Sequence, residues 1–366
     1  MTETEACVAL NLIPNLGPVR LRKLLARFET AAHVLEAKAS ELRSVEGIGP
    51  ELATTLAEWP RRIDLAGELR MIAEFGARIV TQQAPEYPRQ LREIHNPPIV
   101  LYVWGDLREG DRHGIGVVGS RKTSHYGLET AKKLSYQLAY AGLTVVSGLA
   151  RGIDTAAHQG ALAAEGRTIA VIGSGLMDLY PPENAALAAK IARSGAVISE
   201  YPMKFPPSQQ TFPYRNRIVA GWGSGVLVVE AGLASGAIIT ANQALEQGRM
   251  VYAVPGPIDR PTSQGTNRLI QQGAKLVMGA SDILDDLQCL FPEMPKQMKA
   301  EEISLSEQEA GVLAQIGADE TPFDSIVNGS EVPQHKVSAA LLSLEMKRLV
   351  KQLPGQLYVR TRVAGS

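Results

Sequence analysis

Glycine and arginine stand together directly after a run of β-branched residues at Gly119-Ser120-Arg121-Lys122. Small residues let backbone N–H groups approach a phosphate closely, and an arginine adds a planar pair of donors. Gly119 alone could serve only to make a tight strand-to-helix turn. Two consecutive cations have no packing role in such a turn, so the segment predicts an anion-binding loop.

A second loop of the same kind spans residues 147–152, with two glycines, a serine and an arginine ahead of an expected helix. Asp154 lies at the start of that helix, where a carboxylate stabilises the first turn, so it is interpreted as a cap and not as a catalyst. Neither loop matches G-x-G-x-x-G or G-x-x-x-x-G-K-[ST], which disfavours ordinary dinucleotide or nucleoside triphosphate binding. The candidate phosphate contacts in this loop are Ser147, Gly148, Arg151 and Gly152.

In a third loop an aromatic residue stands beside two arginines, because Phe212 precedes Arg215, Asn216 and Arg217. A stacking face next to phosphate partners is what a single-stranded nucleic acid requires. The alternative is an arginine pair on the surface with Phe212 in the core. A fourth loop offers further backbone amides and hydroxyl groups, and its candidates are Ser235, Gly236 and Thr240.

Evidence for catalysis is weak in this sequence. Glu230 is the one carboxylate near these loops that could act as a base, and neither His125 nor His158 has a partner at nucleophile–base spacing. The segment after Glu230 resembles the layout of Rossmann-like enzymes that cleave nucleoside monophosphates, but it lacks their Pro-Gly-Gly and Gly-Thr pairs. The two cysteines cannot build a disulfide framework or, unaided, a zinc site. We therefore expect no catalytic residue, no metal and no cofactor, with an N-glycosidase-like enzyme as the alternative.

The elements that must position these loops follow from the periodicity of the middle segment. Between residues 81 and 288, short β-branched runs alternate with amphipathic helical stretches, joined by connections of a few residues. This alternation is typical of a parallel sheet covered by helices on both faces. The predicted fold class is α/β, with a Rossmann-like doubly wound domain whose strand ends bring the loops to one edge.

Two smaller modules flank this domain. Residues 1–80 read as helices joined by two similar hairpins with Gly-Pro pairs, which resembles a tandem helix-hairpin-helix module. A bundle that only packs against its neighbour is the alternative. Residues 289–303 suit a linker, and residues 304–366 read as three helices and a hairpin, as in a winged helix. That last module fits DNA or protein docking.

The net charge of the chain is −1, from 37 Lys+Arg against 38 Asp+Glu. This excludes a polybasic nucleic-acid wrapper as a description of the whole chain. Residues 81–270 carry 18 basic and 14 acidic side chains, whereas residues 271–309 carry 3 basic and 8 acidic side chains.

No apolar stretch is long enough to span a membrane, and the acidic N-terminus is unlike a secretion signal, so we expect a cytoplasmic protein.

The ordered segments GSR, SGLARGID, GSGLMDLYPPEN, SEYP, FPYRNR and EAGLASGAIITANQALEQGRMVYAVPG together resemble the DNA-processing protein A (DprA/Smf) family over about 190 residues. The resemblance implies binding of single-stranded DNA, and of double-stranded DNA more weakly, by a homodimer formed through the Rossmann-like domain. It further implies loading of the RecA recombinase during natural transformation, and a positive pocket lined by Arg121, Arg151, Arg215 and Arg217. A protein adaptor without DNA binding is the remaining alternative.

Overall fold

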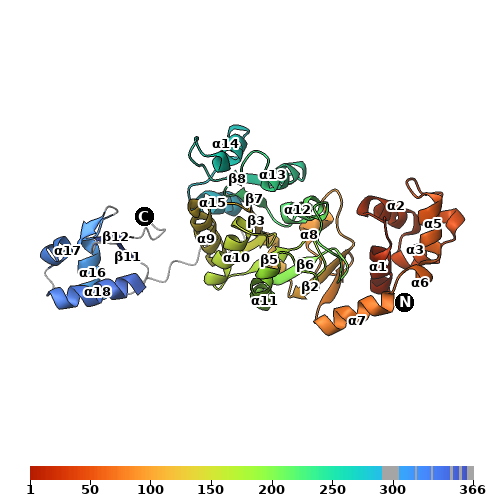
Figure 1. Ribbon diagram of the computed structural model, residues 1–366, viewed down its shortest axis with the longest axis horizontal. Helices are drawn as coiled ribbons and strands as arrows, with labels where there is room; N and C mark the ends of the chain where they lie inside the picture. Colours follow the sequence, from red (N-terminus) through yellow and green to blue (C-terminus); the bar gives the residue numbers. More distant parts are fainter. Residues whose placement is uncertain (291–304, 318–319, 331–332, 347–348, 354–356, 361–366) are drawn as a thin grey trace. The chain divides into compact units, whose positions relative to one another are not determined.

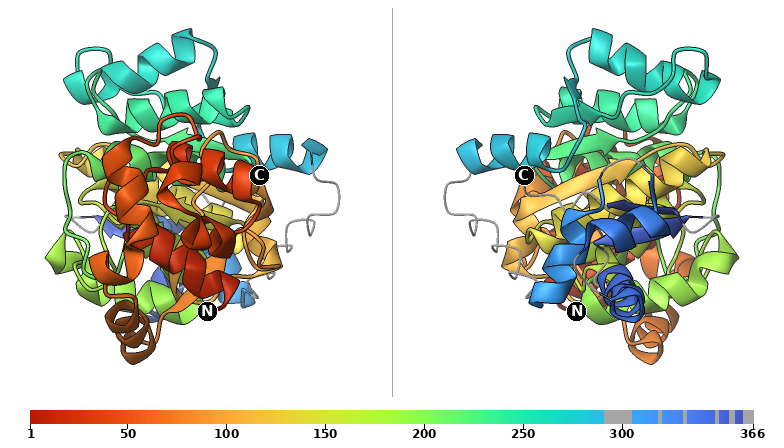
Figure 2. Two further views of the ribbon diagram at one scale, coloured as in Figure 1. Left: turned by 90° about the vertical axis from the view of Figure 1, so that its right-hand side faces the viewer. Right: turned by 90° about the vertical axis from the view of Figure 1, so that its left-hand side faces the viewer.

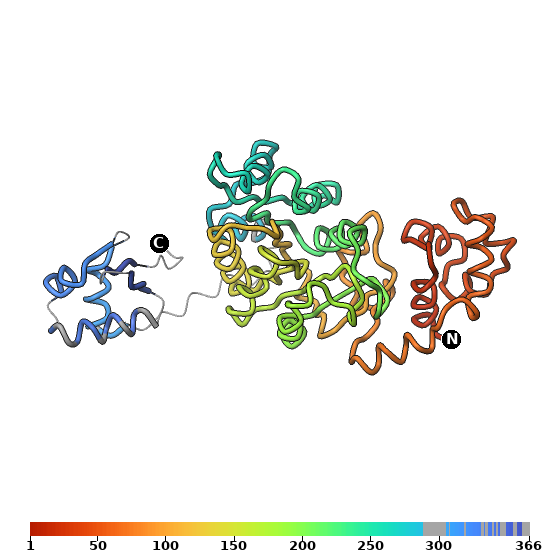
Figure 3. The backbone as a smooth tube through the Cα atoms, viewed as in Figure 1, coloured from red at the N-terminus to blue at the C-terminus, as the bar shows by residue number. Residues whose placement is uncertain are grey.

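The computed structural model describes the chain except for residues 291–304, 318–319, 331–332, 347–348, 354–356 and 361–366 (Figure 3). Its contacts divide into two compact units, Met1–Pro295 and Lys296–Ser366. Most of the predicted linker, 289–303, lies outside the described residues. Among the helices that are described, none combines the length and the apolar composition needed to cross a bilayer.

A large sheet organises the first unit, in the order β1-β2-β6-β5-β4-β3-β7-β8-β9. The strands from β3 onward pair in parallel, as the alternating pattern predicts. The parallel strands are β3 (Gly114–Val118), β4 (Thr144–Ser147), β5 (Thr168–Val171), β6 (Ala196–Ser199), β7 (Gly225–Val228), β8 (Met250–Ala253) and β9 (Lys275–Leu276). The sheet is not wholly parallel, because β1 (Arg78–Thr81) and β2 (Val100–Gly105) add an antiparallel edge. Such an edge is common on otherwise parallel sheets.

Helices cover both faces of this sheet (Figure 1). One face carries α9 (His125–Tyr140), α10 (Ile153–Ala163), α11 (Ala185–Ser194) and α15 (Ser281–Leu290); the other carries α8 (Arg89–Arg92), α12 (Thr211–Gly221), α13 (Gly236–Glu246) and α14 (Gln264–Gln271). Consecutive strand residues enter different cores: Val145 packs with α9 and α10, whereas Val146 packs with α12 and α13. The doubly wound architecture is therefore confirmed.

The N-terminal helices share a core with the sheet. They are α1 (Glu3–Leu12), α2 (Pro18–Phe28), α3 (Ala31–Glu36), α4 (Ala39–Leu42), α5 (Pro50–Ala57), α6 (Trp59–Arg62) and α7 (Leu65–Phe75). Pro18 and Pro50 stand at the first helical positions, as the Gly-Pro pairs predict. The Asn11 side chain donates to the carbonyl of Glu200 at 2.9 Å, and the Met203 amide donates to buried Glu68 at 2.7 Å. Packing on the sheet is thus observed, and phosphate binding by the hairpins stays a prediction.

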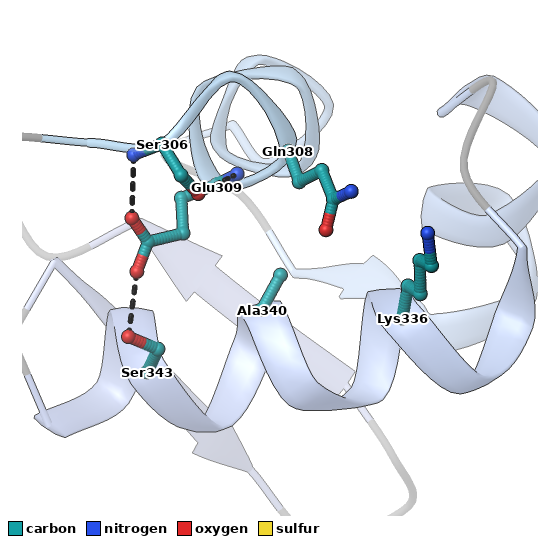
Figure 4. Close-up of a pocket in the computed structure, with 6 residues that line it drawn as sticks. All are labelled: Ser306, Gln308, Glu309, Lys336, Ala340 and Ser343. Atoms are coloured by element: carbon teal, nitrogen blue, oxygen red, sulfur yellow. Dashed lines mark hydrogen bonds between the residues drawn. The ribbon is translucent and has the colours of Figure 1, made fainter.

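The second unit has the winged-helix arrangement (Figure 2). Its helices are α16 (Glu307–Ala314), α17 (Phe323–Gly329) and α18 (Gln334–Met346), and its strands are β10 (Thr321–Pro322), β11 (Val350–Leu353) and β12 (Leu357–Arg360). Glu309 joins α16 to α18, because it accepts hydrogen bonds from the Ser306 amide at 2.7 Å and the Ser343 hydroxyl at 2.6 Å. Figure 4 shows this contact beside a shallow pocket that Gln308 and Lys336 also line.

Candidate nucleic-acid interface

The predicted loops meet at the carboxyl edge of the sheet. From β3 the chain moves to β4, β5 and β6 on one side, and β7 then pairs with the other side of β3. This reversal between β3 and β7 is the topological switch point at which open α/β sheets bind ligands. The loops after β3, β4 and β5 and the start of α12 form the candidate interface.

Gly152 allows the loops after β3 and β4 to pack closely against each other. Its φ of 78° and ψ of −124° suit glycine, and a Cβ there would lie 2.4 Å from the carbonyl oxygen of Ser120. The next amide, of Ile153, donates to that same oxygen at 3.3 Å. Gly152 therefore sets the position of the loop that carries exposed Arg121 and Lys122.

Two arginines and two aromatic rings form a continuous row on this edge. The Arg121 guanidinium lies 4.8 Å from the ring centroid of Phe212, and that ring lies 5.9 Å from Tyr180. The Arg151 guanidinium lies 5.7 Å from the Tyr180 ring and also donates to Glu183. We call these four side chains, Arg121, Phe212, Tyr180 and Arg151, the arginine–aromatic row. Both arginines are exposed, so the row offers cations and ring faces to a ligand.

Arg215 lies beneath the row and is only 4% exposed. Its Nη1 donates to the carbonyl of Val171, and its guanidinium packs on the backbone of Gly148, where a Cβ would lie 2.0 Å from Nη1. Burial lowers the pKa of Arg215, and the nearby carboxylate of Asp154 opposes this shift. Asp154 itself accepts from the amides of Gly148 and Ala150, so it holds the loop after β4 closed. Arg215 thus joins the end of β5 to the loop after β4 and is not itself exposed to a ligand.

Several predicted contacts are engaged within the protein instead. Arg217 is buried and ion-paired with Glu200, its Nη1 lying 2.9 Å from Oε1, and its Nε donates to the carbonyl of Asn96. The prediction that Arg217 lines the pocket is therefore not met by this arrangement. Two predicted hydroxyl contacts are also engaged within the protein. The Ser147 hydroxyl donates to the carbonyl of Val117 at 2.6 Å, and the Thr240 hydroxyl donates to the carbonyl of Gly236 at 3.2 Å. The Gly148 amide is committed to Asp154 at 3.1 Å.

The remaining predicted binding residues lie in the loop after β3, on α12 and at the start of α13. Gly119 lies in a close approach of the loop after β3 to Ile153, and the Ser120 amide donates to the carbonyl of Glu230 at 2.7 Å. Asn216 is half-buried on α12, Ser235 caps α13 through the Ala237 amide at 3.3 Å, and Gly236 is exposed.

A carboxylate of the protein itself lies at the switch point. Buried Glu230 follows β7 and accepts hydrogen bonds from the Thr123 hydroxyl at 2.6 Å, the Ser124 hydroxyl at 2.9 Å and the Ser124 amide at 3.1 Å. Burial raises the pKa of Glu230, but these bonds and one from Thr262 outweigh it and hold the pKa below its usual range. The helix start at which Rossmann folds bind a phosphate is thus already occupied by an anion. Glu230 is committed to the loops and is poorly placed to act as a base.

Comparison with known proteins supplies the family. A family model described as DNA recombination-mediator protein A matches residues 78–288, and one described as the DprA winged helix domain matches residues 296–356. The chain belongs to the DprA/Smf family. The protein Smf of Escherichia coli is 38% identical over 324 residues, which cover 87% of this chain and 86% of that protein. The DNA processing protein DprA of Bacillus subtilis is 39% identical over 254 residues, 68% of this chain and 80% of that protein.

Two solved DprA structures share the fold. DprA from Streptococcus pneumoniae aligns with a TM-score of 0.69 and 36% identity, covering 78% of this chain and 98% of that one. DprA from Helicobacter pylori, whose structure is described as giving insights into a single-stranded DNA binding mode, aligns with a TM-score of 0.52 and 28% identity over 58% of this chain and 96% of that one.

Tyr180 belongs to the row of this DprA/Smf chain but is not among the binding residues that its sequence predicts. It follows β5 in the loop Leu179-Tyr180-Pro181, and its relation to Phe212 depends on how the loops after β5 and β6 fold. The available signal was the one used for Phe212, an aromatic residue in a loop after a predicted strand.

His158 is fully buried on α10, with Nδ1 2.7 Å from the Thr168 hydroxyl. Burial, helped by the charge of Arg215, lowers its pKa to about 3, so it stays neutral in the fold. The unfolded chain takes up this proton near pH 6.5, so it binds more protons than the folded state between that pH and 3. His158 therefore stabilises the fold above pH 6.5, and about 2 kcal/mol of this contribution is lost on acidification to pH 5.

Urea unfolding of the wild type and of His158→Asn, at pH 7 and at pH 5, measures this loss. The wild type should lose more stability than the variant over that interval. An equal loss in both proteins would show that His158 does not contribute to the pH dependence.

Proposed function

We propose that this protein binds single-stranded DNA at the carboxyl edge of its sheet, protects incoming strands, and acts in natural transformation and homologous recombination in the cytoplasm. The observation that carries the proposal is the arginine–aromatic row. Exposed Arg121, Lys122 and Arg151 supply cations for phosphates, and Phe212 and Tyr180 supply rings on which unpaired bases stack. The H. pylori structure, described as showing a single-stranded DNA binding mode, supports this choice of ligand.

This mode of binding is sequence-tolerant and favours single strands over duplexes. Phosphate contacts carry no sequence information, and every base has a face to stack. In a duplex those faces are already stacked on neighbouring bases, so a duplex would gain only the phosphate contacts.

Fluorescence anisotropy with matched single- and double-stranded oligonucleotides over a salt series tests the proposal. Three phosphate contacts on a single strand give a slope of log Kobs against log salt of about −2. The single strand should bind more tightly at every salt concentration. Equal affinity for both forms, or affinity that does not change with salt, would contradict it.

The same geometry favours binding without catalysis. Glu230 is engaged by at least three hydrogen bonds, and His158 is buried and neutral. Among the described residues, no group of three or more His, Cys, Asp or Glu side chains is arranged to hold a metal ion. We therefore propose no chemical step on the DNA.

We further propose that the protein acts as a homodimer through the β9 end of its Rossmann-like domain. β9 is the last strand of the sheet in the described chain, so one of its edges pairs with no other strand of that sheet. Ile258 and Met278, in the loops after β8 and β9, are 90% and 83% exposed. Apolar side chains beside an open strand edge are a typical interface for a second copy.

Ile258→Lys combined with Met278→Lys should convert the dimer to a monomer, because each change places a charge in the apolar contact. Light scattering after size-exclusion chromatography measures the mass. Val19→Lys, at an exposed position of α2, is the control and should leave the dimer intact. A double variant with an unchanged mass would place the dimer contact elsewhere.

The partner that receives the bound strand is proposed to be the RecA recombinase. The family description as a recombination mediator supports a recombinase partner, because a mediator transfers a strand to the enzyme that pairs it. Open-ended binding by phosphate contacts and stacking suits this transfer, since it leaves base edges free for pairing.

A further inference from the structure

The loop after β6 lies directly beside the loop after β5 that carries Tyr180. The Gly175 amide donates to the carbonyl of Phe205 at 2.8 Å, and the Met177 amide donates to the carbonyl of Met203 at 2.9 Å. The two loops are therefore paired through their backbones, and residues 203–205 lie beside the loop that carries Tyr180.

This neighbouring loop repeats the chemistry of the row. The Phe205 ring is 37% exposed and stacks on Tyr201, with centroids 4.8 Å apart and planes 22° apart. Lys204 beside it is exposed, and so is Met177 across the paired backbones. A supported aromatic face next to a free cation has the composition of a single-stranded nucleic-acid contact.

The loop is fixed to the fold beneath these exposed side chains. Met203 is fully buried, and its amide donates to Glu68 of α7 at 2.7 Å. Tyr201 is half-buried, and its amide donates to the Ser199 hydroxyl at 2.9 Å. Phe205 and Lys204 are thus presented on an anchored backbone, which reduces the entropy lost when a ligand binds.

Strand order places this second contact in line with the first. The row is built from loops after β3, β4 and β5 with the start of α12, and β6 is the next strand in the sheet. Neighbouring strands lie about 4.8 Å apart, so β3 and β6 are separated by about 14 Å. A strand of DNA that crosses the carboxyl edge at right angles to the β-strands passes the row and then reaches Lys204 and Phe205.

We propose that Lys204 and Phe205 form a second single-stranded DNA contact, which binds the nucleotides that follow those held by the arginine–aromatic row. Lys204 pairs with a phosphate, and Phe205 stacks on a base with Met177 beside it. This inference rests on the proposed single-stranded DNA binding. It defines the path of the bound DNA strand along the sheet edge and the length of strand that is bound.

Oligonucleotide length separates the two contacts. Lys204→Glu combined with Phe205→Ala should weaken binding of an oligonucleotide of about 15 nucleotides roughly tenfold to a hundredfold, because one stacking and one phosphate contact are lost. Binding of an oligonucleotide of about five nucleotides, which occupies the row, should stay within about twofold of the wild type. Anisotropy titrations at one fixed salt concentration measure both affinities.

A matched double variant controls for charge and for loss of an aromatic ring. Lys190→Glu combined with Tyr140→Ala makes an equal charge change and removes one aromatic ring at exposed positions of α11 and α9, where Tyr140 stacks on Tyr136. This control should bind both lengths as the wild type does, and thermal melts should show both double variants folded. Phe205→Trp, which keeps the ring, should retain wild-type affinity for the longer strand.

The outcomes are distinguishable. A wild-type protein that binds neither length would overturn the proposed function itself. If the wild type binds both lengths and the Lys204/Phe205 variant binds the longer one equally well, the second contact is wrong and the row stands. An equal loss of affinity for both oligonucleotides would also overturn the second contact, because the loop after β6 would then belong to the same contact as the row.

Discussion

Replacing Arg121 by glutamate is expected to weaken binding of a single-stranded oligonucleotide by about a hundredfold. The change removes a charge-assisted hydrogen bond to phosphate, worth about 1.5–3 kcal/mol, and 1.4 kcal/mol corresponds to a factor of ten. It also removes the cation held 4.8 Å from the Phe212 ring and places a negative charge where the phosphate binds. Anisotropy titration at low salt measures the loss.

The exposure of Arg121 allows this result to be separated from misfolding. Its side chain is exposed to solvent, so the thermal unfolding midpoint of Arg121→Glu should stay close to that of the wild type. Lys133→Glu, an equal charge change at an exposed position of α9, should bind almost normally. If Arg121→Glu bound the oligonucleotide with wild-type affinity, the assignment of the row as the DNA site would be wrong.

Gly152→Ala should damage the fold and the DNA site together. Alanine is strained at φ 78° and ψ −124°, and its Cβ would lie 2.4 Å from the carbonyl oxygen of Ser120 and 2.8 Å from that of Arg121. Both contacts are with backbone, so no side chain can move aside to relieve them. We expect a loss of about 3 kcal/mol in the free energy of unfolding. The displaced loop carries Arg121, so oligonucleotide affinity should fall in the protein that remains folded.

Gly236→Ala is the matched control for this substitution. A Cβ on Gly236 meets nothing within 4 Å, and the residue begins α13 without a positive φ. Urea unfolding should therefore show wild-type stability for Gly236→Ala and a lower midpoint for Gly152→Ala. Equal midpoints would contradict the role given to Gly152 in joining the two loops.

A near-neutral protein can bind a polyanion when its cations are gathered by the fold. The chain has a net charge of −1, yet exposed Arg121, Lys122 and Arg151 follow two neighbouring strands at one edge. Few phosphate contacts and two ring faces make such a site depend moderately on salt. That property distinguishes it from a polybasic wrapper.

Sequence periodicity alone predicts the sheet and its helices, because burial on both faces of a parallel sheet imposes continuous β-branched runs between amphipathic helices. The same pattern places the loops of Arg121, Arg151 and Phe212 after strands, and hence near one edge. It does not reveal the antiparallel β1–β2 edge, since strand direction depends on where the chain re-enters the sheet. The winged helix is predicted separately, from three helical stretches followed by a hairpin.

Which side chains remain available to a ligand was decided by tertiary structure. Arg215 and Arg217 are two residues apart in one motif, but one lies beneath the row and the other is ion-paired with Glu200. Tyr180 joins Phe212 across loops that follow different strands, and Glu230 reaches Thr123 across the switch point. A hydrogen bond or ring contact depends on atoms a few ångströms apart, and residues distant in sequence acquire that proximity only when strand order is set. Sequence therefore determined the chemistry present at the edge, and the fold determined which of these side chains stay exposed there.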